Sequence, residues 1–291
     1  MHFSLDLSTL TGAGLCNQLY AVLNACLEAG RGSVVSVSGF RPDMFEAPTC
    51  PLSVVVDIPA TNLRLAKEGL ATISLLTRGE SKKLDPFPMP MPTVSQQRCI
   101  VPSKEAMACA RSAAPQGPYN AIHIRFDIDF LAAYCKDENK ALYNRFICAD
   151  SYEESQLVAQ EIMSLQSTLS LCEDVIMKSS QFISILPANK PLYVCTPVKR
   201  DPRHKLVERY LDRLKHRFPH LTLRSAPLHP KREIAAMVEA CVGMAADEFV
   251  GSPGSTLSAF IASSRSDDGS PVRTRYRNET TGLKFLLCSF K

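Results

Sequence analysis

Short apolar segments alternate with amphipathic helical patterns along most of the chain. The run Pro191-Leu-Tyr-Val-Cys-Thr196 is short and rich in strand-forming residues, whereas 231–242 repeats its apolar residues at helical spacing. Strands that alternate with helices of this length imply right-handed βαβ units and a parallel sheet. Strands are predicted at 3–7, 33–38, 53–58, 180–186, 191–196, 221–224, 248–251 and 283–289, and helices at 19–27, 60–76, 152–165, 203–217, 231–242 and 255–264.

The length of the chain favours two domains, because 291 residues exceed the usual size of a single hydrophobic core. Residues 77–102 contain five prolines and little apolar periodicity, which predicts a long loop or an excursion from the fold. The turn-forming segment Pro115-Gln-Gly-Pro118 then indicates a boundary. The predicted units are therefore 1–115, 116–275 and a C-terminal extension, 276–291.

The segment Phe249-Val-Gly-Ser-Pro-Gly-Ser-Thr-Leu-Ser258 has the composition of a ligand-binding turn. A short strand leads into glycines and hydroxyl residues, and a helical pattern begins at Thr256. Glycines allow backbone N–H groups to approach a ligand, and hydroxyls at a helix N-terminus favour an anion such as phosphate. Ser255 and Thr256 are the candidate contacts. The alternative is an ordinary capped turn between a strand and a helix.

A second candidate segment is Ala121-Ile-His-Ile-Arg-Phe-Asp-Ile-Asp-Phe130. Its polar residues recur at every second position, so in a continuous strand they would share one face. If the strand ended near Arg125, that cation would lie at the carboxyl edge of the sheet, where α/β proteins bind ligands. The planar guanidinium suits a diphosphate. Alternatively, Arg125 forms an ion pair with Asp127 or Asp129.

A third segment, Leu10-Thr-Gly-Ala-Gly-Leu-Cys-Asn-Gln-Leu19, lies between a predicted strand and a predicted helix. That setting is the one a nucleotide-binding loop requires. The segment differs from GxGxxG because Asn17 stands in place of a third glycine, and it has no Walker lysine. A glycine hinge into a helix is the simpler explanation for this segment alone.

Together the three segments resemble the fucosyltransferase superfamily, in particular the protein O-fucosyltransferase-like glycosyltransferases. That family has a glycine-rich loop ending in Asn-Gln, here Gly12-Ala-Gly-Leu-Cys-Asn-Gln18, and a His-x-Arg strand, here His123-Ile-Arg125. Its later Ala-Asp-x-Phe-x-Gly pattern with paired hydroxyls corresponds to 246–257, although Leu257 replaces the usual Phe. The continuation Arg-Phe-Asp-Ile-Asp-Phe-Leu-Ala is similar to the plant and algal branch. The resemblance spans residues from about 8 to 265.

The resemblance implies a GT-B fold, with two Rossmann-like α/β domains whose mostly parallel sheets face each other across a cleft. The first domain would be on the acceptor side and the second would bind the nucleotide sugar. From the first domain, the residues expected to close the donor site are Gly12, Gly14, Asn17 and Gln18.

In the second domain, the resemblance implies that Arg125 neutralises the diphosphate while Ser255 and Thr256 bind its β-phosphate. His123 and Asp247 would contact the guanine base or the ribose. An exposed residue at the start of a strand is the alternative for Asp247.

The implied reaction is inverting glycosyl transfer without a metal or other cofactor, in which Arg125 and a helix N-terminus stabilise the departing diphosphate. Asp127 or Asp129 is the candidate base for the acceptor hydroxyl. We do not interpret their Asp-x-Asp pattern as a metal site, because the corresponding residues of the family are not metal ligands. GDP-fucose is the first-choice donor and a glycan or protein hydroxyl the expected acceptor. The alternatives are a rhamnosyltransferase of the same fold, a catalytically silent nucleotide- or sugar-binding relative, and an unrelated doubly wound nucleotide-binding protein.

Composition agrees with a globular enzyme and adds few constraints, since apolar residues make up 45% and charged residues 21% of the chain. The basic stretch 205–217 alternates with apolar residues, so we interpret it as one face of an amphipathic helix and not as a nucleic-acid site. The eleven cysteines are scattered without zinc-ligand spacing. Buried free thiols are expected at Cys26, Cys195 and Cys241.

No signal peptide or membrane span is visible in the sequence. We therefore expect a soluble, cytoplasmic protein. The alternative is a lumenal protein of the Golgi or ER whose N-terminal anchor has been removed, the setting in which disulfides would form.

Overall fold

The structure is a computed structural model of the chain. It describes residues 1–7, 10, 14–39, 50–75, 81–86, 91–123, 140–147, 152–164, 186–195, 211–212, 214–223, 232–251, 255–265, 274–277 and 284–289. Everything below concerns these residues.

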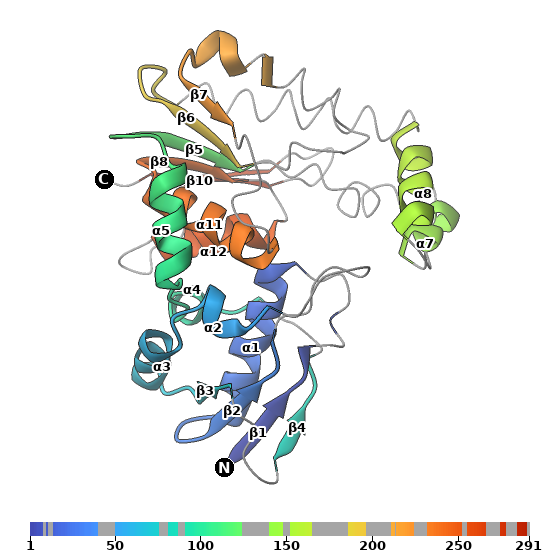
Figure 1. Cartoon of the computed structure of the whole chain (residues 1–291), viewed down its shortest axis with the longest axis vertical. Coiled ribbons are helices and arrows are strands. Elements are labelled where there is room, and N and C mark those ends of the chain that lie inside the picture. The colour runs from blue at the N-terminus through green and yellow to red at the C-terminus, as the bar shows by residue number, and fades with distance from the viewer. Residues whose placement is uncertain are drawn as a thin grey trace.

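The N-terminal part of the chain forms a four-stranded parallel sheet (Figure 1). Its strands, in spatial order, are β3 (Thr72–Ser74), β2 (Val34–Val37), β1 (His2–Leu5) and β4 (Lys82–Leu84). All three pairings are parallel, as crossover connections require. Helix α1 (Leu15–Ala29) connects β1 to β2, and helix α3 (Ile58–Lys67) precedes β3.

The rest of the chain contributes a six-stranded sheet. The strand order is β7 (Leu221–Leu223), β6 (Leu192–Cys195), β5 (Asn120–His123), β8 (Glu248–Gly251), β10 (Lys284–Ser289) and β9 (Thr274–Arg277). The first four strands are parallel, whereas β10 pairs antiparallel with both β8 and β9. The prediction of an α/β protein with two mostly parallel sheets is confirmed.

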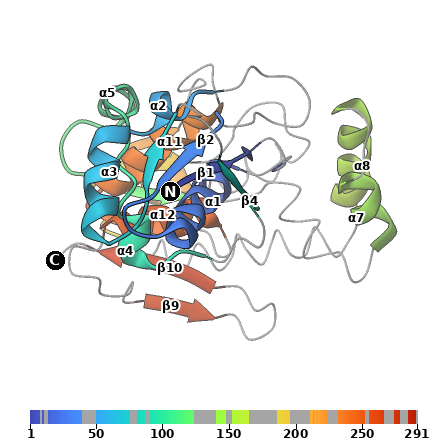
Figure 2. The ribbon, with the colours of Figure 1, turned by 90° about the horizontal axis from the view of Figure 1, so that it is seen from below.

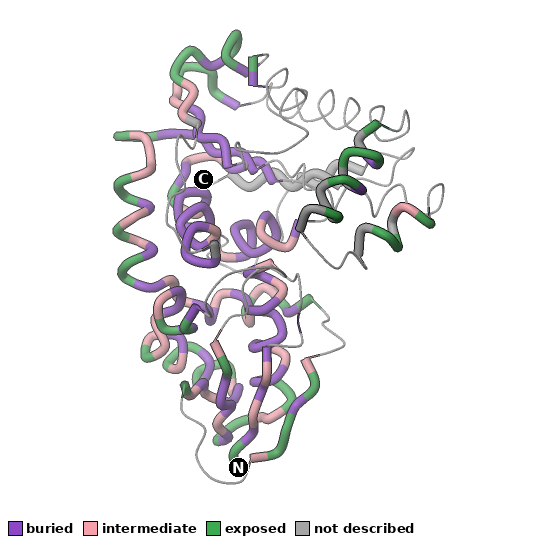
Figure 3. Tube along the Cα trace, turned by 45° about the vertical axis from the view of Figure 1, so that its right-hand side comes forward, coloured by how far each residue is buried: buried purple, intermediate pink, exposed green. Residues whose placement is uncertain are grey.

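A layer of helices separates the two sheets. Viewed as in Figure 1, α11 (Arg232–Ala245) and α12 (Thr256–Arg265) lie beneath the six-stranded sheet, facing α1, α2 (Leu52–Val55) and α4 (Val94–Gln97). Helix α5 (Lys104–Ala113) runs alongside this layer and leads into β5. Figure 3 shows that buried positions concentrate in this layer and on the adjoining strands.

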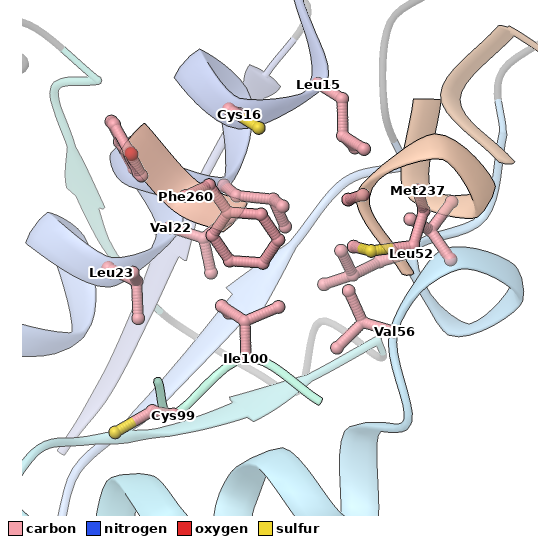
Figure 4. Close-up of a cluster of buried hydrophobic side chains, with 14 of the residues drawn as sticks. Leu15, Cys16, Val22, Leu23, Leu52, Val56, Cys99, Ile100, Met237 and Phe260 are labelled. Atoms are coloured by element: carbon pink, nitrogen blue, oxygen red, sulfur yellow. The ribbon is translucent and has the colours of Figure 1, made fainter. Parts of the chain in front are cut away.

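One hydrophobic core extends through that layer and joins the two halves of the chain. Phe260 of α12 has no exposed surface and lies among side chains of the N-terminal half, including Val22 and Ile100 (Figure 4). A fully buried aromatic side chain contributes about 1.5–3 kcal/mol relative to an exposed one. Because this burial depends on both halves, the layer holds α1 and α12 together.

Helices α7 (Lys140–Ile147) and α8 (Tyr152–Ser164) pack against each other to one side of the sheets (Figures 1 and 2). Arg145 and Glu161 connect them through an exposed ion pair of 2.8 Å. Exposed pairs of this kind contribute little to stability. The predicted helix at 152–165 is confirmed.

Two predicted segments were wrong. Residues 53–58, predicted as a strand, form helix α2 followed by an isolated bridge between Val56 and Pro102. Leu52 and Val55 lie one helical turn apart and are both buried, so packing overrides the strand preference of the valines.

The stretch 77–102, predicted as a loop, contains β4 and α4. Lys82 and Lys83 are exposed on β4, as is common on an edge strand, while Leu84 enters the core. The predicted helix 60–76 is shorter, because Gly69 follows α3 with φ 73° and the chain then turns into β3.

The predicted boundary near residue 115 separates the strands of the two sheets, although the division into 1–115, 116–275 and 276–291 stays a prediction. The extension supplies β10 to the six-stranded sheet. All but the last residue of the predicted strand at 180–186 and most of the predicted helix at 203–217 fall outside the described residues.

Candidate functional site

The carboxyl ends of two neighbouring parallel strands bring His123 next to α12, the helix that follows the hydroxyl-rich turn. In the register of β5 and β8, Asn120 pairs with Glu248 and Ile122 with Val250, so His123 and Gly251 end the strands at one edge. His123 is 6% exposed, and its Nδ1 lies 2.7 Å from the Oγ of Ser258 in α12. Which of the two atoms donates depends on the imidazole tautomer. Segments 135 residues apart are therefore connected by a buried hydrogen bond.

Gly251 has a specific steric role at this edge. A Cβ atom added there would lie 2.8 Å from the Cβ and 3.0 Å from the Oγ of Ser258, and 3.2 Å from the ring of Phe249. Any side chain would displace the partner of His123. The sequence predicted glycines that admit a ligand, and the structure shows that this glycine makes room for α12 to approach β8.

Ser255 immediately precedes α12 and caps it. Its Oγ accepts a hydrogen bond from the backbone N–H of Ser258 at 3.4 Å, and its carbonyl accepts one from Ala259 at 3.0 Å. The capped-turn interpretation of this segment is therefore correct for the local structure. It is compatible with an anion site, because a hydroxyl that accepts one hydrogen bond can still donate another. Thr256 follows as the first helical residue and is partly exposed.

The start of α1 lies beside the start of α12. Gly14 is the N-cap of α1 and its side-chain position is open, with no atom within 4 Å of an added Cβ. Asn17 is partly exposed, whereas Gln18 is completely buried. The hydroxyl of Tyr20, in the second turn of α1, donates to the backbone carbonyl of Thr256 at 3.2 Å and so joins α1 to the first residue of α12.

Asp247 lies at the opposite edge of the sheet. It precedes β8, its N–H donates to the carbonyl of Tyr119, and its carboxylate pairs with Lys190 at 2.5 Å. The length of β8 separates it from Gly251 by about 13 Å, at roughly 3.3 Å per residue. The structure therefore does not bring Asp247 together with His123 and Ser255, because a strand directs its two ends to different edges.

Groups near Asp247 have altered acidity. Burial raises the pKa of Tyr119 to about 12, and burial also raises the pKa of Glu248, against the opposing effect of Arg265 and Lys190. Both groups lie at the amino ends of their strands, away from His123 and Ser258.

Three residues that the sequence analysis missed support these elements. Ser258 contacts His123, and Tyr20 joins α1 to α12. Arg265 is 5% exposed and donates to the carbonyls of Gly243 at 2.7 Å and Asp247 at 2.8 Å, which satisfies groups at and just beyond the end of α11. Of these three, only Ser258 could have been found from the sequence, because it lies three residues after Ser255, a predicted phosphate contact, and so shares its helix face.

Four predicted residues, Gly12, Arg125, Asp127 and Asp129, lie outside the described residues. Their assignments stay predictions.

A cavity of about 550 Å³ lies elsewhere, between α2, α3 and the start of α5. Val56, Asp57 and Lys104 are among its lining residues, and none of the predicted site residues lines it. It is therefore not part of the candidate site.

Three further observations concern the described part of the chain. Within it, no group of three His, Cys, Asp or Glu side chains could hold a metal ion. No helix there has both the length and the apolar character needed to cross a membrane. Cys26, Cys195 and Cys241 are buried free thiols, as predicted.

Comparison with known proteins identifies related sequences and folds. The family model described as GDP-fucose protein O-fucosyltransferase matches residues 92–267. The crystal structure of POFUT1 in complex with GDP superposes with a TM-score of 0.54, and that of POFUT1 in complex with GDP-fucose with 0.52. Each is 12% identical, with 93% of this chain and 96% of that chain covered, so the likeness concerns the fold. No curated protein matches the chain by sequence.

Proposed function

The chain belongs to the family of GDP-fucose protein O-fucosyltransferases, and from this we propose that it transfers fucose from GDP-fucose to a hydroxyl of a protein or glycan. It is a fucosyltransferase-like glycosyltransferase with the GT-B fold, as the resemblance in its motifs implied. The POFUT1 structures contain GDP and GDP-fucose, which supports the choice of donor for this chain.

In this proposal the donor diphosphate binds at the edge formed by the end of β5 and the start of α12. The first backbone N–H groups of α12 and its dipole favour an anion there. The hydroxyls of Ser255 and Thr256 donate to the β-phosphate. Arg125 follows His123 by two residues in the sequence and neutralises the diphosphate through two parallel hydrogen bonds.

The observation that supports this arrangement is the 2.7 Å contact between His123 Nδ1 and Ser258 Oγ. It connects the His-x-Arg segment to the helix that begins with the phosphate-binding hydroxyls. Both groups are buried, so an unmade bond would cost about 1–3 kcal/mol. His123 is thereby held at the site, and its imidazole is the proposed contact for the base or ribose.

The N-terminal half completes the donor site through the start of α1. Asn17 is the proposed donor contact because its side chain is partly exposed. Gln18 is buried, so we assign it to holding the loop that contains Gly12 and Gly14. Asp247 is left out of this donor site because of its place at the other edge.

The proposed mechanism is inverting and independent of metal. The acceptor hydroxyl attacks the anomeric carbon as the bond to the β-phosphate breaks, and negative charge develops on the departing GDP. Arg125 and the N-terminus of α12 are the groups proposed to stabilise that charge, because donors held in place before the reaction need no reorganisation during it. Asp127 or Asp129 accepts the proton of the acceptor hydroxyl.

Donor binding and turnover test the proposal directly. Thermal denaturation with GDP, UDP or dTDP should show the largest stabilisation with GDP, about 2.7 kcal/mol at a hundredfold excess over Kd. Incubation with GDP-fucose should release GDP, which a rhamnosyltransferase using a dTDP or UDP donor would not do. Binding of GDP without release of GDP or transfer would assign the chain as a silent binding relative.

Two further measurements examine the mechanism. Turnover should persist in excess EDTA and should not require added Mg²⁺ or Mn²⁺. NMR of the first-formed product should show the anomeric configuration opposite to that of the donor. A complete loss of turnover in EDTA that Mn²⁺ restores would refute the metal-independent mechanism while leaving the donor assignment intact.

A further inference from the structure

Tyr20 occupies an unusual position between the two halves of the proposed donor site. It lies in α1, is 3% exposed, and its hydroxyl is 2.9 Å from the Oε1 of Gln97 and 3.2 Å from the carbonyl of Thr256. One hydroxyl proton thus has an acceptor in α4 and an acceptor in α12. Tyrosine in an apolar layer usually needs such partners, since an unpaired buried hydroxyl is costly.

The Gln97 side chain is itself fixed, which gives the contact a defined direction. Gln97 is 1% exposed, and its Nε2 donates to the carbonyl of Pro92 at 2.7 Å. Its Oε1 is therefore oriented toward Tyr20. The Tyr20 hydroxyl is held as a donor, because burial raises its pKa far above the ordinary value of 10.

Tyr20 has a proposed donor contact beside it on each of the two helices, α1 and α12. Asn17 precedes it by three residues and so lies on the same face of α1, about one turn nearer the helix start. Thr256 is the first residue of α12 and a proposed phosphate contact. Tyr20 therefore lies between two proposed donor contacts, Asn17 on α1 and Thr256 on α12.

We propose that Tyr20 is a positioning residue that fixes the separation between Asn17 on α1 and Thr256 on α12, so that both reach the same nucleotide diphosphate. The inference rests on the proposed function. It assigns Tyr20 no contact with the donor or with the reacting atoms.

Tyr119 offers a matched control for the substitution Tyr20→Phe. It is 5% exposed, and its hydroxyl donates to the carbonyl of Val242 at 2.8 Å, so Tyr119→Phe deletes an equally buried tyrosine hydroxyl bonded to a backbone carbonyl. Tyr119 precedes β5 and lies at the edge of the sheet away from His123. Both variants keep the ring and hence most of the packing.

The experiment measures four quantities for each variant of the chain: the urea midpoint, the Kd for GDP by titration calorimetry, and kcat and KM for GDP release from GDP-fucose. Both variants should lower the urea midpoint by similar amounts. Tyr20→Phe should raise the GDP Kd and the donor KM about three- to tenfold, with kcat within about twofold. Tyr119→Phe should leave Kd and KM within about twofold of wild type.

The outcomes separate the inference from the function on which it rests. If wild type binds GDP and Tyr20→Phe binds it equally well, or both variants weaken binding equally, the positioning role is refuted and the proposed function stands. If wild type neither binds GDP nor releases it from GDP-fucose, the proposed function fails and the inference fails with it.

Discussion

Replacement of Gly251 by alanine tests the contact that joins β5, β8 and α12. The backbone of Gly251 is outside the left-handed region, so the effect of the substitution is purely steric. An added Cβ would lie 2.8 Å from the Cβ of Ser258 and 3.2 Å from the ring of Phe249. Ser258 and Phe249 both have 0% exposed surface, so neither can move into solvent to relieve the overlap.

The expected loss of stability follows from two effects. Overpacking of a closed core by one methyl group costs about 1–3 kcal/mol. If the overlap is relieved by displacing Ser258, the 2.7 Å contact with His123 lengthens, and a buried hydrogen bond left unmade costs about 1–3 kcal/mol. Because relief of the first effect produces the second, they do not add fully. We expect Gly251→Ala to lower the free energy of unfolding by about 2–4 kcal/mol.

Gly243→Ala is the matched control. An added Cβ there would lie 3.0 Å from Ile261 Cδ1 and 3.2 Å from the same ring of Phe249, and its three nearest atoms belong to these two residues and not to Ser258. The substitution lies within α11, where alanine is favoured over glycine by about 1 kcal/mol, which offsets part of the crowding. We expect a change of about 1 kcal/mol or less in the free energy of unfolding.

Urea denaturation and GDP titration of both glycine variants, under identical conditions, provide the comparison. Gly251→Ala should also raise the GDP Kd roughly tenfold, which corresponds to a loss of about 1.4 kcal/mol in binding free energy. Gly243→Ala should leave the GDP Kd unchanged. Adding Ser258→Gly removes both overlapping atoms, so the double variant should regain stability relative to the sum of the single variants without regaining GDP affinity. A Gly251→Ala protein as stable as wild type would refute the packing argument.

Three further predictions concern Arg125, Arg265 and two buried thiols. Arg125→Ala should reduce transfer at least about 100-fold while the free energy of unfolding stays within about 0.5 kcal/mol, and near-normal activity would remove this residue from the mechanism. Arg265→Met leaves carbonyls after α11 without their donor and should cost about 3 kcal/mol in urea denaturation; a loss below 1 kcal/mol would contradict the capping role. Burial raises the pKa of Cys26 and Cys241 from 9 to about 12, so unfolded thiols ionise at lower pH than folded ones. Their stabilising contribution is complete below pH 9 and lost between pH 9 and 12, by about 1.4 kcal/mol per thiol at pH 10. Cys241→Ala should therefore make the loss of stability between pH 7 and pH 10, measured by urea titration, smaller by about 1.4 kcal/mol.

The fold was largely predictable because its strands and helices have clear periodicity. The predicted strands at 33–38, 191–196 and 248–251 correspond to β2, β6 and β8, and each is apolar and flanked by turn-forming residues. Prediction failed where local preference and tertiary packing disagree. The valines of α2 are strand formers, and β4 is a three-residue edge strand whose lysines gave it the appearance of a loop.

The candidate site was predictable as a set of segments but not as a set of contacts. Motif order indicated that the His-x-Arg strand and the turn after β8 belong together, and the parallel register of β5 and β8 now explains why. The sequence could not show that Ser258 is the partner of His123. Asp247 illustrates the same limit, because a motif gives the order of residues but not the edge of the sheet at which each one lies.

The position of α12 makes donor binding and stability difficult to separate in this protein. Its first residue is a proposed phosphate contact, its middle places Phe260 in the core that joins the two halves, and its last residue, Arg265, satisfies the end of α11. A substitution anywhere in α12 is therefore expected to alter both properties at once. Loss of activity in such a variant is evidence about the site only when an equally destabilised variant, altered away from the carboxyl edge of β5 and β8, retains its GDP affinity.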